Sequence, residues 1–532
     1  MIDRDLHKAR ALLIEGNALL RSVAIGQLHD VGIGHVTPCA RVRDARVLLE
    51  QERFDVVLCN REFEGSDISG QDLLDELRRE QILPLSTVFL MMVAQPTYHE
   101  VAEAAESALD GVIVRPFTTA ALADRLLEAR QRKRALADVL QALDGGELEQ
   151  AFARALRHFQ EGQTYADSAG RIAADLLLRL NRPADACTLF DKLAQRRATA
   201  WVRLGLARAQ LASGDAPQAR RTVVQVIADE PGSADAHEAM GRLQWGAGEL
   251  EAAADSLERS VEITPGCLVR RQLAGRLAQV LQRTEAAAAH LDRARVLGVG
   301  SRLFDPMVWL CLAWSRAGDR EALQNLRSQL ARACEAAPED SRLRRLDTAV
   351  QVLEAALAGP AAPSPAWPAL AEGLADAQAD ALTGQVIVGT LARIDRAAWP
   401  AEHEIIVTRV GMRYCSSRGA SETLAGLAGP SPDLEQRLRA CHGQVQALAE
   451  RAVEASMRGD PVAAAERLVE EAERTLNARL VETAAVIARR HVDRHAGLAA
   501  VQARCDALMA RLADPSGGLP LGRRFGPAPV AR

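Results

Sequence analysis

Residues 11–17 read Ala-Leu-Leu-Ile-Glu-Gly-Asn, and this stretch decides how the N-terminal part of the chain folds. Four apolar residues are followed at once by an acid, a glycine and an amide, after which a helical pattern runs to Leu28. A short continuous apolar run is typical of a strand that is buried on both faces of a sheet. The sequence therefore predicts a strand that ends next to Glu15 and leads directly into a helix.

Further apolar runs of the same kind follow along the chain. They are separated by helix-like or loop-like segments, including a helix expected from Gln71 to Arg79. The runs lie at residues 56–59, 88–93 and 112–114, with a weaker candidate at 34–37. This alternation predicts a parallel sheet covered by helices on both faces, with its functional site at the carboxyl ends of the strands.

The order and spacing of these landmarks resemble the receiver domain of two-component response regulators, over residues 1–130. The resemblance implies a flavodoxin-like α/β domain with a five-stranded parallel sheet in the order 2-1-3-4-5. It also implies an acidic pair, a phospho-accepting Asp, a hydroxyl residue and a Lys at the strand ends. In this chain those positions hold Glu15 with Gly16, then Asn60, Val93 and Arg115.

Three of these substitutions remove chemistry that phosphorylation requires. Phosphoryl transfer to a carboxylate needs an ionised nucleophile, a divalent cation and donors for the phosphoryl oxygens. The amide of Asn60 cannot form an acyl phosphate, Gly16 has no side-chain oxygen for a metal, and Val93 has no hydroxyl. The sequence therefore predicts a degenerate receiver, or pseudo-receiver, that is not an enzyme and holds no cofactor.

Three alternatives stay open for this cleft. Glu15 and Glu62 could form a weak cation site. The protein could be a phosphorylation-responsive regulator that uses nonstandard residues. It could also bind a ligand or nucleotide in the cleft near Glu15, Asn17 and Asn60.

The middle of the chain, residues 136–358, repeats itself every 34 residues. Gly214 and Pro231 recur 34 positions later as Gly248 and Pro265. Two antiparallel helices with their turns need about 34 residues; Gly ends the first helix in a left-handed conformation, and Pro stops the second. The pattern resembles tetratricopeptide repeats. This resemblance implies an all-α helical-repeat solenoid that binds a protein or peptide on its concave face.

Polar residues on the first helix of each repeat are the candidates for lining that face. Such side chains must face either solvent or the groove, because they are not part of the apolar stripe. The candidates are Arg203, Arg208, His237, Arg242 and Arg271.

The remaining segments are predicted from their composition and pattern. Residues 359–368 are dense in Pro and read as a linker, residues 369–514 continue as a helical region, and residues 515–532 read as a disordered tail. His491 and His495 lie one helical turn apart without a third ligand nearby, so no metal site is predicted.

The overall composition excludes several classes of protein. The 532 residues are 48% hydrophobic and carry a net charge of -5, which argues against disorder and against attraction to nucleic acid. No apolar run approaches the roughly 20 residues of a membrane span. The nine cysteines form no CxxC pair, which favours reduced thiols in the cytoplasm. The sequence thus predicts a cytoplasmic, non-catalytic bacterial signalling adaptor that binds protein partners, and it leaves the oligomeric state open.

Overall fold

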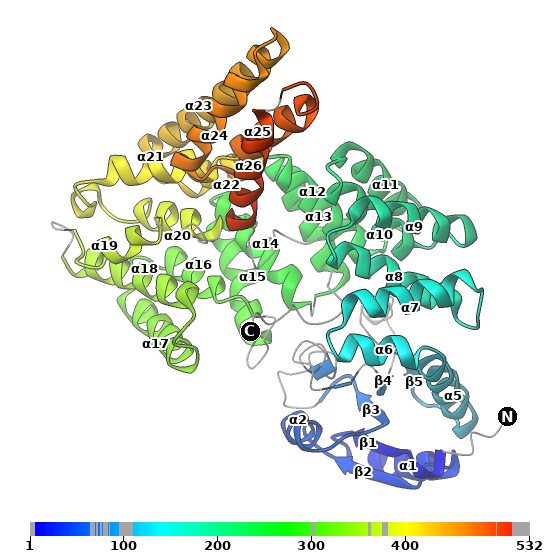
Figure 1. The fold of residues 1–532 in the computed structure, drawn as a ribbon. Helices are drawn as coiled ribbons and strands as arrows, with labels where there is room; N and C mark the ends of the chain where they lie inside the picture. The colour runs from blue at the N-terminus through cyan, green and yellow to red at the C-terminus, as the bar shows by residue number, and fades with distance from the viewer. Residues whose placement is uncertain are drawn as a thin grey trace.

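The computed structural model describes most of the chain as a five-stranded sheet followed by a curved array of helices (Figure 1). The described residues are 6–63, 70, 73–74, 77, 83–84, 86–94, 110–265, 267–298, 304–359, 363–374, 381–495 and 497–512. The helix predicted from Gln71 to Arg79 falls largely outside them, and the predicted tail at 515–532 lies wholly outside.

All five strands of the sheet are parallel, and their order is β2-β1-β3-β4-β5. Their bounds are β1 (Arg10–Ile14), β2 (His35–Cys39), β3 (Val56–Asn60), β4 (Val88–Val93) and β5 (Gly111–Val114). The flavodoxin-like α/β class and the strand order predicted from the sequence are confirmed, and the weak candidate strand is β2. Ile14 is in register with both Cys39 and Cys59, so the carboxyl ends of the strands line up along one edge.

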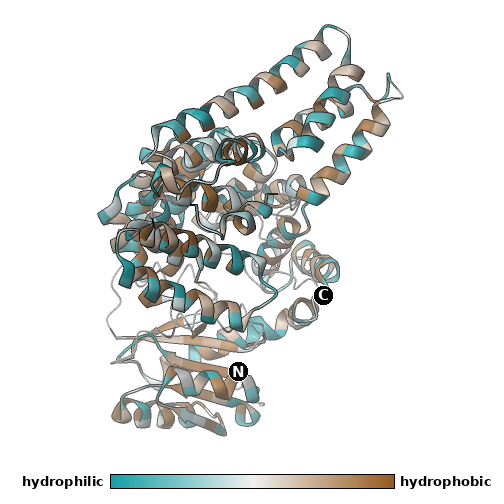
Figure 2. Ribbon diagram, turned by 90° about the vertical axis from the view of Figure 1, so that its left-hand side faces the viewer, coloured by the Kyte–Doolittle hydropathy of each residue, from teal (hydrophilic) through white to brown (hydrophobic). Residues whose placement is uncertain are grey.

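Helices cover both faces of this sheet because its strands are apolar on both sides. Helices α1 (Ala18–Asp30) and α5 (Thr119–Ala135) pack on one face, where Leu28 and Leu126 share a buried cluster with Leu13. Helix α2 (Val42–Gln51) packs on the other face, where Leu49 contacts the cluster that contains Leu12. Successive strand residues point to opposite faces, which explains the continuous apolar runs. Figure 2 shows strands of this sheet in brown, the hydrophobic end of the colour scale.

The helical array begins directly after α5 and has the predicted period. The first helices of four successive repeats start at residues 166, 200, 234 and 268, which are 34 apart. They are α8 (Ala166–Arg179), α10 (Ala200–Ala212), α12 (Ala234–Gly246) and α14 (Leu268–Val280). Their antiparallel partners are α9 (Pro183–Arg196), α11 (Ala216–Asp229), α13 (Leu250–Ile263) and α15 (Thr284–Leu297).

Other helices extend the array on both sides. Before it lie α6 (Ala137–Asp144) and α7 (Leu148–Gln160). After it lie α16 (Met307–Ser315), α17 (Arg320–Ala336), α18 (Ser341–Ala358), α19 (Trp367–Glu372), α20 (Ala381–Leu391), α21 (His403–Tyr414), α22 (Arg418–Leu427), α23 (Pro432–Met457), α24 (Pro461–Thr475), α25 (Ala478–His491) and α26 (Leu498–Leu512). Two short 3₁₀ helices, Leu6–Lys8 and Arg396–Ala398, complete the described elements.

The turn between the two helices of a repeat is left-handed, as the sequence predicts. Gly214 and Gly248 have φ angles of 87° and 78°. Asn181 and Gln282 take the same place in neighbouring repeats with φ angles of 56° and 57°. The conformation is therefore a property of the repeat, and glycine is only its least strained occupant.

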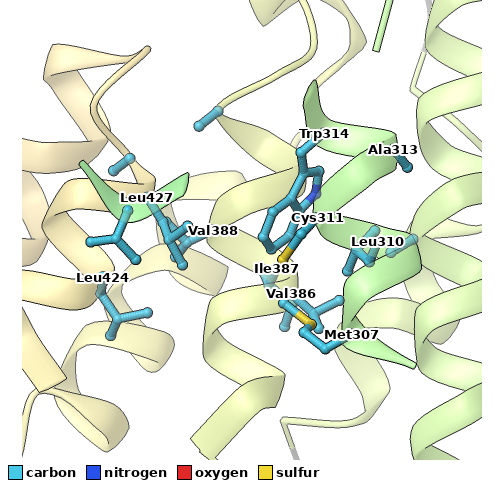
Figure 3. Packing of buried hydrophobic residues seen from close by; sticks show 14 of the residues in the cluster. Met307, Leu310, Cys311, Ala313, Trp314, Val386, Ile387, Val388, Leu424 and Leu427 are labelled. Carbon is cyan, nitrogen blue, oxygen red and sulfur yellow. The ribbon is translucent and has the colours of Figure 1, made fainter. Parts of the chain in front are cut away.

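One buried cluster joins residues on both sides of the predicted linker at 359–368. It extends from Trp245 to Leu438 and includes Trp367, which is only 2% exposed. Figure 3 shows Trp314 of α16 facing α20 and α22 across this core. The sequence predicts a linker at residues 359–368, but Trp367 within this segment packs into the core that the helices on both sides share. A second cluster holds α23–α26 together with the end of α21.

Within the described part of the chain, no helix combines the length and the apolar character needed to cross a membrane.

Candidate functional site

The strand ends bring four of the predicted site positions to one edge of the sheet. Glu15 follows β1, Asn60 ends β3, Val93 ends β4 and Arg115 follows β5. The backbone N–H of Arg115 donates to Val93 O over 2.8 Å, which places the last two side by side. Because parallel strands end at a common edge, distant parts of the sequence meet here.

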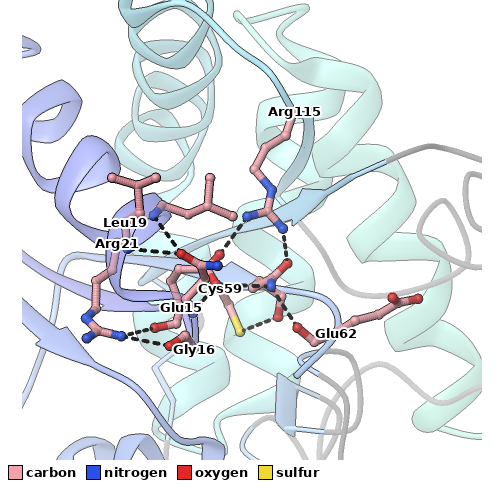
Figure 4. Close-up of polar contacts among 10 residues, drawn as sticks. Glu15, Gly16, Leu19, Arg21, Cys59, Glu62 and Arg115 are labelled. Atoms are coloured by element: carbon pink, nitrogen blue, oxygen red, sulfur yellow. Dashed lines mark hydrogen bonds and ion pairs between the residues drawn. The ribbon is translucent and has the colours of Figure 1, made fainter. Parts of the chain in front are cut away.

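Arg115 bridges the acid and the amide of this edge (Figure 4). Its Nη1 donates to Glu15 Oε2 over 2.7 Å, and its Nη2 donates to Asn60 Oδ1 over 2.6 Å. The Asn60 amide nitrogen lies 3.5 Å from Glu15 Oε1 and donates to the Glu62 carbonyl over 2.7 Å. Glu15 is 2% exposed and Asn60 9%, while the Arg115 side chain is 16% exposed. A cation, an anion and an amide thus form one closed network.

The start of α1 holds Glu15 from its other side. The backbone N–H of Asn17 donates to Glu15 Oε1 over 2.9 Å, and the Asn17 side chain caps α1. Arg21 Nη1 donates to the carbonyls of Glu15 and Gly16 over 2.7 and 3.1 Å. Gly16 therefore takes part through its backbone alone. The sequence had not singled out Arg21, although its position one turn into the helix that follows Glu15 is the available signal.

Gly70 is a second residue at this edge that the sequence analysis missed. A Cβ at Gly70 would lie 2.3 Å from Asn60 O and 2.8 Å from Cys59 Sγ, so no side chain fits. Burial raises the pKa of the Cys59 thiol well above its usual value. Val93 is 3% exposed and adds an apolar wall. The pocket edge is thus closely packed around Asn60.

Among the described residues at this edge, the acceptor position holds no carboxylate and Glu15 is the only buried acid. Glu15 is already paired with Arg115, and Figure 4 shows the Glu62 carboxylate pointing away from it. Across the described residues, no group of three or more His, Cys, Asp or Glu side chains is placed to hold a metal ion. His491, which lies one helical turn before His495 in the sequence, has its Nε2 3.4 Å from the hydroxyl of Ser456. The network therefore joins the strand ends electrostatically.

Four of the five candidates on the array are partly exposed and already have partners. Arg203 pairs with Asp229, and Arg208 lies 3.5 Å from Asp175. The remaining two contact backbone carbonyls at the end of the preceding helix: His237 Nε2 lies 2.9 Å from Pro231 O, and Arg271 Nε donates to Pro265 O over 3.1 Å.

Arg242 differs from the other four, contrary to the prediction. It is 8% exposed, and its Nε donates to Glu238 Oε1 over 2.8 Å. Glu238 in turn accepts from Arg270 Nε over 3.0 Å, which links α12 to α14. Arg242 therefore belongs to a buried ionic network and does not line an open groove.

Two family models match parts of the chain. A response regulator receiver domain matches residues 11–127, and a tetratricopeptide repeat matches residues 177–243.

Curated relatives share the N-terminal part. Chemotaxis protein CheY-3 of Vibrio cholerae is 28% identical over 117 residues, which cover 22% of this chain and 88% of the relative. Chemotaxis protein CheY of Pseudomonas aeruginosa is 24% identical over 123 residues, which cover 23% of this chain and 97% of the relative.

Two solved structures are also similar. The chemotaxis response regulator CheY4 of Vibrio cholerae has 22% identity and a TM-score of 0.20, covering 24% of this chain and 98% of its own. Naa15/Naa10 bound to HypK-THB has 14% identity and a TM-score of 0.24, covering 76% of this chain and 67% of its own. The fold assignment rests on the sheet order and on the 34-residue helix period. Residues 11–127 therefore form a response regulator receiver domain, and tetratricopeptide repeats follow it.

Proposed function

We propose that this protein is a non-catalytic bacterial signalling adaptor, in which a pseudo-receiver is joined to an array that binds a protein or peptide. The observation that carries the proposal is Asn60 at the acceptor position, with Arg115 donating to its amide oxygen over 2.6 Å. A neutral amide that is held as an acceptor cannot attack a phosphoryl group.

The buried ion pair between Arg115 and Glu15 also argues against phosphorylation, because it competes with the divalent cation that this reaction needs. A divalent cation would have to displace the Arg115 guanidinium from Glu15, whose side chain is 2% exposed. Such a cation would compete with the 2.7 Å ion pair that Arg115 already makes, and it would find no second carboxylate at Gly16. The cation that assists phosphorylation in receivers therefore meets an occupied carboxylate here.

The array supports the binding half of the proposal. Arg203, Arg208, His237 and Arg271 are partly exposed polar residues on the first helices of successive repeats. Solenoids use such helices to present an extended concave surface to a partner. A cytoplasmic setting belongs to the proposal as well, since all nine cysteines are free.

Intact-mass measurement tests the pseudo-receiver. The full-length protein is incubated with acetyl phosphate and magnesium, and its mass is expected to stay unchanged. A receiver domain that carries the acceptor aspartate, treated in parallel, is the positive control for the reagent. A phosphate adduct that is retained in wild type and lost in Asn60→Ala would contradict the proposal and support a phosphorylation-responsive regulator. A saturable thermal stabilisation by a nucleotide or a divalent cation would instead support the ligand-binding alternative.

Affinity purification from the native bacterium tests the array. The full-length chain is used, because α12–α22 share one core and an isolated array would lack part of it. The double variant Arg208→Glu and Arg271→Glu is expected to lose partners that wild type retains. Arg458→Glu is the matched control, because its side chain is 79% exposed just after the distant helix α23. Unchanged partners in the double variant would assign recognition to another surface.

A further inference from the structure

Helix α22 lies across the carboxyl ends of α12 and α14 and nearly touches both backbones (Figure 1). A Cβ at Gly419 would lie 2.4 Å from Trp245 O, and a Cβ at Gly426 would lie 2.7 Å from Val280 O. Any side chain at either glycine would push the helices apart. Two glycines thus mark two places where α22 makes backbone-to-backbone contact with the array.

The spacing of these two contacts matches the repeat. Gly426 follows Gly419 by seven residues, which is a rise of about 10.5 Å along a helix. The positions that they touch, Gly246 and Val280, are 34 residues apart and hence equivalent in successive repeats. Helix α22 therefore spans one repeat interval almost end to end.

Polar contacts fix α22 at the same two repeats. Trp245 Nε1 donates to Thr423 Oγ1 over 2.8 Å at the first repeat. Gln282 Nε2 donates to Gly426 O over 2.5 Å at the second. Both bonds join residues far apart in sequence, so they tie the C-terminal region back onto the array.

The carboxyl end of α22 is held by a partly buried arginine. Arg393 Nη1 donates to Leu427 O over 3.2 Å and to Gly389 O, at the end of α20, over 2.9 Å. Burial lowers the pKa of Arg393 to about 10. Two helix ends, which carry partial negative charge, thus surround one cation.

We propose that α22 is a strut that fixes the separation of α12 and α14 and thereby the curvature of the array at that point. The preceding repeats show no equivalent brace at the same edge in the described part of the chain. A Cβ at Gly248 would lie 2.8 Å from Arg418 Cγ at the start of α22, whereas at Gly214 and Gly146, the equivalent turn positions of earlier repeats, nothing among the described residues comes within 4 Å. The array then consists of a braced half from α12 onward and an unbraced half before it, which bends more easily to fit a partner.

Hydrogen exchange on the full-length protein tests the strut. Gly426→Ala places a methyl group against Val280 and is expected to raise exchange at least tenfold in the last turns of α12 and α14, as well as in α22. Gly443→Ala on α23 is the matched control, because no described residue lies within 4 Å of its Cβ, and it should leave these amides unchanged. Small-angle scattering of Gly426→Ala is expected to show a larger radius of gyration.

A second variant distinguishes the loss of the contact between α22 and the array from a general failure of the protein to fold. Thr423→Val keeps the shape of the side chain but removes the acceptor of the Trp245 indole, and it should raise exchange in α12 with little change in α25. Faster exchange confined to α22 in both variants, with α12 and α14 at wild-type rates, would overturn the proposal. So would exchange at wild-type rates throughout.

Discussion

Arg115 and Asn60 are joined by a 2.6 Å hydrogen bond from the guanidinium Nη2 to the amide Oδ1, across 55 residues of sequence. The same guanidinium pairs with Glu15, so one side chain connects the ends of β1 and β3 with the residue after β5. This bridge makes the edge of the sheet dependent on a single cation.

Arg115→Met is expected to destabilise the receiver domain by about 3 kcal/mol, because it leaves the buried Glu15 carboxylate without its cation. Native-state hydrogen exchange of the β1 and β3 amides in the full-length chain measures this loss. Arg125→Met is the matched control, because the Arg125 side chain is 60% exposed on α5, and it should leave the same amides unaffected. In the double variant Glu15→Gln and Arg115→Met, the loss should be smaller than the sum of the single losses. Additive losses would show that the pair does not act as a unit.

Gly205→Ala is expected to destabilise the array by about 1–3 kcal/mol, because its Cβ would lie 2.3 Å from the Phe190 ring. Gly246→Ala on α12 is the matched control, since no described residue comes within 4 Å of its Cβ. It should be neutral or slightly stabilising. Denaturant titration followed by circular dichroism compares the two, and equal midpoints would contradict the close crossing of α9 and α10.

Buried thiols are expected to make the protein less stable at alkaline pH. Desolvation by burial raises the pKa of both Cys311 and Cys415 to about 12. Between about pH 8.5 and pH 12 the unfolded chain loses these protons while the folded chain keeps them, so stability falls as pH rises. The slope is about 1.4 kcal/mol per pH unit for each thiol.

Alkylation followed by mass spectrometry checks the same property residue by residue. Iodoacetamide at pH 8.5 should modify the partly exposed Cys187 and Cys334 first. Cys311 and Cys415 should react only after denaturation, which also controls for the reagent. Rapid modification of Cys311 in the folded protein would contradict its burial.

Asp110→Asn is expected to loosen the end of α5 by about 1 kcal/mol. Asp110 Oδ1 lies 2.9 Å from Lys133 Nζ and 3.3 Å from Arg132 Nη2, and these two basic side chains are partly exposed. An asparagine can still accept from the Phe89 N–H, which Asp110 Oδ2 now does over 2.9 Å, so the loss reports the charge alone. Asp124→Asn, on the exposed side of α5, is the control. Hydrogen exchange at residues 130–136 should increase in Asp110→Asn only.

The sheet and the repeat period could be predicted because both depend on the pattern of residues that are close together in the sequence. A run such as 88–93 is apolar throughout, since it is covered on both faces, and glycines such as Gly214 mark turns. The strand-end residues could be placed together for the same reason, because parallel strands share one edge. The local sequence pattern does not determine which hydrogen-bond and ion-pair partners these side chains have in the folded chain.

For Arg242 and for the Pro-rich segment, exposure was predicted from the local sequence, but tertiary packing buries Arg242 and Trp367. Arg242 is buried because Glu238 lies one turn earlier and Arg270 comes from the next repeat. The first of these partners was readable as an i,i+4 pair, and the second depends on packing between repeats. Trp367, near the end of the predicted linker, packs into a core, since burying its large apolar surface outweighs the tendency of the neighbouring Pro to open the chain.

Helix α5 passes into α6 with only Leu136 between them, and Asp110 holds the end of α5 against the sheet. Leu136 itself is 3% exposed, so the junction is packed and does not act as a loose hinge. The receiver and the first helix of the array are consequently coupled through a packed junction. A small rotation of the β5 edge would be passed along α5 to α6, and the more easily bent repeats before α12 would absorb it.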